Sequence, residues 1–402
     1  MPRSAGSITT SRPVRAPGMS KVAAQRVCCL PANRSRGRGQ GLVSVGRRRF
    51  GLDVARGVAV LGMFTVHLGP DDDGSGLDVA VDVAHGRSSA LFAVLVGVTL
   101  IAVVDRHRAE PGTPAGAAWI AVLVRAGILV ALGTILTAAG APVEVILAYY
   151  GVYLLMVLPM CGFSARRLAW IAAAWALIGP QVLFVVRPLV EGVAPDSVDP
   201  FVTGTYPALS WIPLVLAGMA IGRTEFADWL SRGAAAAAGV ALAVIGYGGS
   251  WVALRRFPGV DPALRDSSLW WANPDGYFDH AHWSWLLVAA PHTQTTLSVI
   301  GNSGVALVLI VAVSAVTDRC RALRRPVLPL AAVGSMSLTV YLAHIVGIWV
   351  LDANGAPVQS WSAVAGFIVI VVAAATAWSR WVGRGPVEAI FHRCSAAVQR
   401  LG

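Results

Sequence analysis

Charged residues are scarce in this chain. Asp, Glu, Lys and Arg together make up 13 % of its 402 residues, whereas apolar residues make up 56 %. Soluble globular domains carry about a quarter charged residues, so the composition excludes an ordinary soluble protein and indicates a polytopic membrane protein. Lysine is almost absent, since Lys21 is the only one, and arginine carries nearly all of the net charge of +11. Many arginines lie near the N-terminus or in short segments between apolar runs, which is typical of topology signals rather than of nucleic-acid binding.

Familiar catalytic and metal-binding signatures are missing as well. The chain has no P-loop, no Gly-x-Gly-x-x-Gly after a predicted strand and no Gly-x-Ser-x-Gly elbow. His280 and His282 could both bind a metal, but no third ligand accompanies them at a fixed spacing, so we expect no metal. No cysteine spacing implies a zinc site or a disulfide framework. The five cysteines are Cys28, Cys29, Cys161, Cys320 and Cys394.

The N-terminal segment, residues 1–48, lacks apolar periodicity and is rich in Arg, Ser, Gly and Pro. Such a segment cannot bury a core, so we expect a disordered basic tail, or one that rests on anionic lipid. No apolar run before Phe50 resembles the core of a cleaved signal peptide, and Met19 is an alternative start. At the other end, residues 386–402 are expected to form a short cytoplasmic tail.

Between these tails, residues 49–385 are expected to form one transmembrane domain. Its apolar segments are long enough to span a bilayer, so we predict an all-α polytopic membrane protein with about ten transmembrane helices. The ten segments are roughly 51–69, 88–104, 117–138, 144–162, 168–187, 206–222, 234–254, 296–316, 327–351 and 361–382.

Arginine-rich loops alternate with loops that are rich in Asp and Glu. Because cytoplasmic loops carry an excess of arginine, this alternation predicts that both termini are cytoplasmic. The arginines of the inner loops are Arg106, Arg108, Arg166, Arg167, Arg223, Arg232, Arg319, Arg321, Arg324, Arg325, Arg380 and Arg384.

The first span contains three ionisable residues, Asp53, Arg56 and His67. At about 100° per residue, Arg56 and His67 point within roughly 20° of each other, and they lie roughly 16 Å apart along the helix axis. Ionisable groups at membrane depth are functional by default, and a flexible substrate arm could lie between these two. The alternative is that Asp53 and Arg56 form a structural pair and that His67 lies at the outer interface.

Histidines gather on the predicted outer side. The segment from Arg255 to Thr295 is the longest outer loop and is rich in tryptophan around His282 and Trp283. An interfacial helix would also place tryptophan there, but a long aromatic loop with histidines suits a site for a polar, ring-bearing substrate. Histidine is the commonest general base. The histidines concerned are His67, His85, His280, His282, His292 and His344.

Several later spans also carry polar groups at membrane depth. Ser337, Tyr341 and His344 recur on one face of the ninth span, where small residues alone would be explained by helix packing. Arg125 in the third span and Glu144 at the mouth of the fourth should face the interior of the bundle, as structure or as site.

The first span carries a family resemblance. The segment from Leu52 to Met63, followed by His67, resembles the opening helix of a family of transmembrane acyltransferases. This family includes the proteins related to heparan-α-glucosaminide N-acetyltransferase and the bacterial YeiB-like proteins. Weaker similarities to the bacterial branch occur at 85–92, at Pro291-His292 and at 337–341, so that the resemblance spans roughly 50 to 385.

The resemblance implies transfer of an acetyl group from cytosolic acetyl-CoA to an amino sugar or similar acceptor on the far side of the membrane. The phosphopantetheine arm reaches some 16 Å, which matches the separation of Arg56 and His67. In the human-type enzyme the reactive histidine lies in the loop after the first helix. That loop, residues 71–76 here, contains no histidine, so His67 or His85 is expected to take its place.

The leading hypothesis is therefore a multi-pass acyltransferase of the bacterial plasma membrane. His67 and His85 are the predicted catalytic residues, with His67 as a general base or a transient acyl carrier. Asp53, Arg56 and Arg125 are the predicted acyl-CoA site. The predicted acceptor site consists of His282, Trp283, Tyr341 and His344. A homodimer stays open, and the alternative function is a transporter or permease for a small polar solute.

Overall fold

The computed structural model describes residues 34–70, 76–109, 116–193, 195, 198–224, 229–272 and 282–400. These ranges contain helices, turns and loops but no strand, which confirms the predicted all-α class. The chain divides into two units, Met1–Gly46 and Arg47–Gly402. In the first unit the described residues, 34–46, are helical, and residues 1–33 of the predicted tail lie outside the described ranges.

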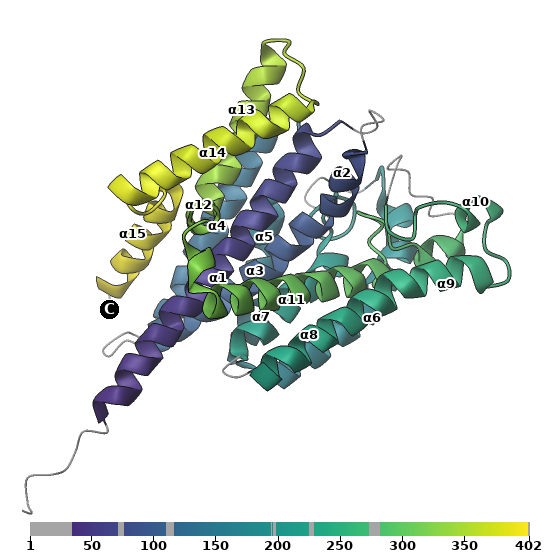
Figure 1. Ribbon diagram of the computed structural model, residues 1–402. Coiled ribbons are helices and arrows are strands. Elements are labelled where there is room, and N and C mark those ends of the chain that lie inside the picture. Colours follow the sequence, from purple (N-terminus) through teal and green to yellow (C-terminus); the bar gives the residue numbers. More distant parts are fainter. Residues whose placement is uncertain are drawn as a thin grey trace, which may run out of the picture. The chain divides into compact units, whose positions relative to one another are not determined.

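The described helices follow one another along the chain as Figure 1 shows. They are α1 (Arg34–Leu68), α2 (Asp78–Ala84), α3 (Arg87–Ala109), α4 (Ala117–Ala138), α5 (Leu147–Val157), η2 (Leu158–Gly162), α6 (Ala165–Val190), α7 (Ala208–Arg223), α8 (Trp229–Ala243), η4 (Val244–Gly248), α9 (Gly249–Arg256), α10 (Pro262–Arg265), η5 (Trp283–Leu287), α11 (Thr296–Arg319), η6 (Arg321–Arg324), α12 (Leu328–Ser335), α13 (Ser337–Ala353), α14 (Trp361–Trp381) and α15 (Pro386–Arg400).

The apolar helices identify a multi-pass membrane protein. Within the described ranges, seven helices are long and apolar enough to cross a membrane, or eight if the bent pair α12 and α13 is one span. Two further apolar helices, Leu147–Gly162 and Ala208–Arg223, coincide with the remaining predicted segments. They are shorter than the roughly 20 residues that a span needs, so length alone does not establish the predicted count of ten.

Helices α3 and α7 pack closely through glycine. A Cβ atom on Gly97 of α3 would lie 2.0 Å from the carbonyl oxygen of Val215, and one on Gly218 of α7 would lie 1.9 Å from that of Val94. Inside a bilayer, helices associate through van der Waals contact, which small residues permit by letting the backbones approach. Any larger residue at Gly97 or Gly218 would force α3 and α7 apart.

The predicted ninth span, 327–351, is broken, which corrects the expectation of one continuous helix. Helix α12 ends at Ser335, α13 begins at Ser337, and their axes differ by 84°. Gly334 lies so close to α1 that a Cβ atom would be 1.7 Å from the carbonyl oxygen of Asp53. This packing places the end of α12, just before the break, beside α1.

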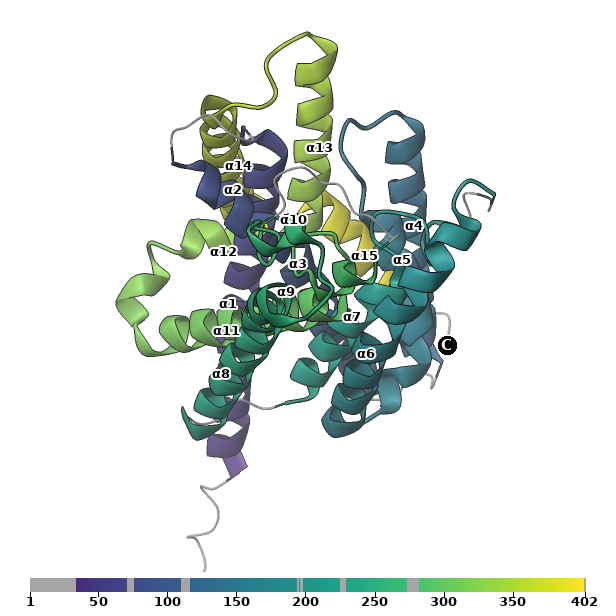
Figure 2. The same cartoon turned by 90° about the vertical axis from the view of Figure 1, so that its right-hand side faces the viewer.

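The C-terminal residues, expected to be a tail, form α15. Helix α14 returns from the end of α13, and α15 follows it and packs against α4 and α13 (Figures 1 and 2). A carboxylate oxygen of Glu388 in α15 accepts hydrogen bonds from the backbone N–H groups of Leu338 and Thr339, at 2.9 and 3.2 Å. These N–H groups belong to the first turn of α13, which has no partners within its own helix, so α15 caps the broken helix.

Candidate functional site

The first cavity has a volume of about 510 Å³, and we call it the arginine pocket. Four arginines line it: Arg56 of α1, Arg106 of α3, Arg125 of α4 and Arg384, which precedes α15. Among its described lining residues Glu388 is the only acidic one, so the lining carries a clear positive charge. Cavities of a few hundred Å³ suit small-molecule ligands, and arginines suit anionic ones.

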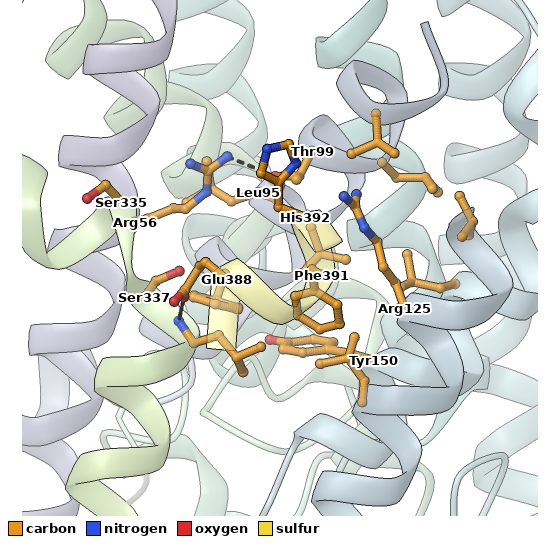
Figure 3. A pocket seen from close by; sticks show the side chains of 18 of the residues that line it. Arg56, Leu95, Thr99, Arg125, Tyr150, Ser335, Ser337, Glu388, Phe391 and His392 are labelled. Carbon is orange, nitrogen blue, oxygen red and sulfur yellow. Dashed lines mark hydrogen bonds between the residues drawn. The ribbon is translucent and has the colours of Figure 1, made fainter. Parts of the chain in front are cut away.

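The arginines approach the pocket from opposite walls. Figure 3 shows Arg56 on one side and Arg125 on the other, with Phe391 and Glu388 of α15 between them. The guanidinium carbon of Arg125 lies 5.9 Å from the ring centroid of Phe391, within the range of a cation–π contact. Helix α15 therefore forms one wall of this pocket, which is also lined by Arg56 and Arg125, two residues of the predicted donor site.

Arg56 is held by two neighbours. Its Nη1 donates to Oδ1 of Asp53 at 2.5 Å, and its Nη2 donates to Oγ1 of Thr99 at 2.9 Å. Thr99 in turn donates to the carbonyl oxygen of Leu95 at 2.6 Å. The structure thus contains the Asp53–Arg56 pair that was predicted as the structural alternative, and it also places Arg56 in the pocket lining.

The second cavity is smaller, about 280 Å³, and we call it the histidine pocket. Three histidines line it: His67 at the end of α1, His85 between α2 and α3, and His292 before α11. Glu144 and Tyr206 contribute an exposed carboxylate and a buried phenol. His67 and His85, the two predicted catalytic residues, therefore lie in one cavity.

His292 is held by an unusual backbone turn. His292 and Gln294 have positive φ angles of 57° and 61°, a conformation that non-glycine residues adopt only when the surroundings enforce it. The side-chain oxygen of Gln294 accepts hydrogen bonds from Ser210 and Trp211, at 2.6 and 2.8 Å, and its amide donates to the carbonyl oxygen of Thr205 at 2.8 Å. These three bonds fix the turn that carries His292.

The imidazole of His292 lies among other rings. Its centroid is 5.2 Å from that of His85, 5.4 Å from Tyr206 and 6.4 Å from Trp211. Among the described residues its Nδ1 has no hydrogen-bond partner. Desolvation, with smaller contributions from His85 and His67, lowers the pKa of His292 to about 3, so this ring is neutral at pH 7.

His67 contacts a second buried histidine behind the pocket. Its Nδ1 lies 3.0 Å from Nε2 of His344, whose Nδ1 lies 2.6 Å from the carbonyl oxygen of Tyr341. Both Tyr341 and His344 are buried, and neither lines the histidine pocket. The structure therefore places these two predicted acceptor residues behind His67 rather than in the cavity.

A thin wall separates the two pockets. Arg56 and His67 are eleven residues apart on α1, about 16 Å along the axis. Phe92 and Tyr150 line the arginine pocket and stack with their ring centroids 5.7 Å apart. The hydroxyl of Tyr150 donates at 3.1 Å to the carbonyl oxygen of Ser89, a residue that lines the histidine pocket. One layer of side chains therefore lies between the cavities.

The predicted outer-loop residues lie elsewhere. His282 caps η5 by accepting from the backbone N–H of Ser284, and Trp283 is 44 % exposed. Neither residue lines either pocket, and His280 lies outside the described ranges. Within those ranges no three side chains of His, Cys, Asp or Glu come together as a metal site would require.

Several lining residues were not predicted as site residues from the sequence. Arg106 and Arg384 were predicted as topology signals, His292 only as an outer histidine and a landmark, and Glu388 as part of a tail. These residues reach the pockets because the ends of distant helices meet there and because one strained turn orients His292. A periodic sequence pattern reveals neither feature.

The fold and the two stacked pockets define a multi-pass membrane protein with a cationic cavity and an imidazole cavity in one helical bundle. Residues 48–251 match the family described as "Heparan-alpha-glucosaminide N-acetyltransferase, catalytic". Since this match covers half of the chain, the protein belongs to that family of membrane N-acetyltransferases. Residues 276–397 match the family described as "Protein of unknown function (DUF418)". No curated protein matches the chain.

Proposed function

We propose that this protein transfers an acetyl group from acetyl-CoA to the primary amine of an amino sugar or a similar acceptor. The observation that carries the proposal is the stacking of a cationic pocket and an imidazole pocket along α1 and α3, with one layer of side chains between them. The distance from Arg56 to His67, about 16 Å, suits a donor whose phosphates and thioester are separated by a long flexible arm.

The arginine pocket is the proposed donor site. Its positive lining fits the phosphate groups of CoA, because arginine can grip phosphate oxygens through two parallel hydrogen bonds. Arg56 and Arg125 would hold the donor from facing walls (Figure 3). The apolar lining by Phe92, Leu95 and Val96 suits the pantetheine arm as it approaches the wall.

The histidine pocket is the proposed acceptor and reaction site. The acceptor nitrogen attacks the thioester carbonyl carbon, so that a C–N bond forms and the C–S bond breaks. His67 takes the proton from the amine and returns it to the departing sulfur, which gives an N-acetylated product and CoA thiol. Glu144, exposed in this lining, would attract the ammonium form of the acceptor, which releases one proton to solvent before the neutral amine attacks.

The proposed orientation places the arginine pocket and both termini on the cytoplasmic side of a bacterial plasma membrane, with ten spans. Support comes from the arginine-rich loops and from the two shorter apolar helices at the remaining predicted segments. In a variant whose only cysteine is the exposed Cys320, an impermeant thiol reagent should label the protein only after permeabilisation. A single cysteine at Asn354→Cys, in the exposed turn after α13, should be labelled in intact cells. The reverse pattern would invert the orientation.

The activity itself is tested with purified protein in detergent. Radiolabelled acetyl-CoA and glucosamine should yield N-acetylglucosamine, whereas glucose, which has no amine, should yield no acetylated sugar. Binding of acetyl-CoA is measured separately by calorimetry. Absence of both binding and transfer would contradict the proposed function.

A further inference from the structure

His67, His344 and the backbone of Tyr341 form one continuous chain of hydrogen bonds. The distance from Nδ1 of His344 to the carbonyl oxygen of Tyr341 is 2.6 Å, and the distance from Nδ1 of His67 to Nε2 of His344 is 3.0 Å. Both are distances of well-formed hydrogen bonds. The planes of the two imidazoles differ by 12°, and their centroids are 5.3 Å apart. This is the geometry of two rings joined edge to edge by a bond that lies in their common plane. The chain therefore runs from the histidine pocket into helix α13.

The direction of this chain follows from its last acceptor. A carbonyl oxygen can only accept, so the Nδ1 of His344 must carry a proton that it donates to Tyr341. A neutral imidazole has one N–H, so the Nε2 of His344 is an acceptor. The proton between the rings then belongs to the Nδ1 of His67, and the lone pair of His67 is on Nε2.

We propose that His344 is a positioning residue that holds His67 in the tautomer whose unprotonated Nε2 serves the histidine pocket. This inference rests on the proposed function, because it is in acetyl transfer that His67 needs a free lone pair. His67 accepts the proton of the acceptor amine at Nε2 while its Nδ1–H stays bonded to His344. His344 keeps its own proton throughout and never touches the substrate.

The surroundings explain why a neutral ring suits this position. His344 is 0 % exposed, and the ring centroid of Phe64 lies 4.5 Å from its own. A carboxylate here would bury a charge among apolar side chains before any reaction, at a large desolvation cost. An imidazole that donates to a carbonyl oxygen provides an oriented acceptor without a buried charge. When His67 becomes protonated, the bond to His344 gains strength because its donor is then charged.

Two substitutions separate positioning from packing. In His344→Gln the side-chain oxygen can still accept from the Nδ1 of His67, whereas His344→Leu fills similar space without any acceptor. With histidine labelled by ¹⁵N in its ring, the two nitrogens of His67 report which of them carries the proton. The signals of His67 are assigned by their loss in His67→Gln.

In the wild type we expect a protonated Nδ1 and an unprotonated Nε2 on His67. His344→Gln should keep this pattern, and His344→Leu should lose it. A proton on Nε2 of His67 in the wild type overturns the inference, and so does an unchanged pattern in His344→Leu. The wild-type measurement decides the question even if both variants fail to fold.

Transfer kinetics distinguish this inference from the proposed function. We expect kcat to fall about 10²- to 10⁴-fold in His344→Leu and to stay within about tenfold of the wild type in His344→Gln, with the KM for acetyl-CoA unchanged in both. Equal losses in the two variants, with the tautomer retained in His344→Gln, would overturn the positioning role. If the tautomers behave as expected and no protein transfers acetyl, the proposed function fails while the assigned tautomer stands.

Discussion

The arginine pocket and the histidine pocket are built by different means. Long side chains from α1, α3, α4 and the segment before α15 line the first, and of its arginines Arg56 has both an ion pair and a hydroxyl partner. In the second, one hydrogen bond to His344 holds the ring of His67, and a strained turn holds His292. A flexible anionic ligand can be bound by long, adaptable cations, whereas proton transfer requires groups held to within a fraction of an ångström. Under the proposed function, this difference suits donor binding in the arginine pocket and proton transfer in the histidine pocket.

The sharpest test of this contrast is His67→Gln. If the histidine pocket performs the chemistry, the transfer rate should fall about 10²- to 10⁴-fold, because the general base is lost. The dissociation constant of acetyl-CoA should not change, since the arginine pocket is untouched. The control is His282→Gln, at a histidine that lines neither pocket, and it should retain activity. Full activity in His67→Gln with loss in His282→Gln would move the reaction centre to the outer loop.

Arg125→Ala should show the opposite pattern. Removal of one charged contact to phosphate costs about 1.5–3 kcal/mol, so the dissociation constant of acetyl-CoA should rise roughly 10- to 100-fold. The value of kcat at saturating donor should change little, which steady-state kinetics and calorimetry can measure. Arg255→Ala removes an arginine that stacks on Trp251, away from both pockets, and should leave binding intact. A fall in kcat without a change in binding would mean that the two pockets do not divide binding from chemistry.

The wall between the pockets should set the length of the acyl group. Phe92→Ala removes half of the Phe92–Tyr150 stack and should raise the rate ratio of propionyl-CoA to acetyl-CoA about tenfold, since one methylene in a confined site is worth about 1–3 kcal/mol. Leu100→Ala enlarges the same pocket eight residues further along α3 and should leave the ratio unchanged. An equal effect of both substitutions would indicate that total volume, not the wall, selects the acyl group.

The smallest expected effect concerns acid stability. The pKa of His292 falls from 6.5 to about 3 on folding, so between these values the unfolded chain binds more protons than the folded one. Stability that His292 contributes above pH 6.5 is therefore lost as the pH falls toward 3. In detergent, the thermal midpoint of the wild type should be lower at pH 5 than at pH 7. In His292→Gln this difference should be smaller by a few degrees. An unchanged difference in His292→Gln would contradict the lowered pKa of this ring.

The sequence predicted the helices better than it predicted the pockets. Apolar runs identify helices because the bilayer requires them, and the 3.6-residue period was enough to put Arg56 and His67 on one face of α1. Both residues line cavities along that helix. The prediction failed at the break after Ser335, which lies beside the close approach of Gly334 to α1, a tertiary contact that the local pattern does not show.

The site residues divide in the same way. Those on regular helices, Arg56, Arg125 and His67, could be selected from intramembrane charge alone. His292 depends on two residues in the left-handed region and on the hydrogen bonds of Gln294, which come from segments far apart in the chain. The role proposed for His344 could not be inferred without its distance to His67, because a buried histidine on a helix face has no fixed partner in sequence.

The contact of Glu388 with α13 bears on how this chain can evolve. The arginine pocket takes Arg56, Arg106 and Arg125 from the region matched by the acetyltransferase family, and it takes Arg384 and Glu388 from the region matched by the second family. Neither region encloses the cavity alone. A recombinant gene that joins the first region of one relative to the second region of another would therefore have to match both halves of one charged lining. The two regions should be inherited together as a single unit, and exchange between homologous genes should succeed more readily outside 48–397 than within it.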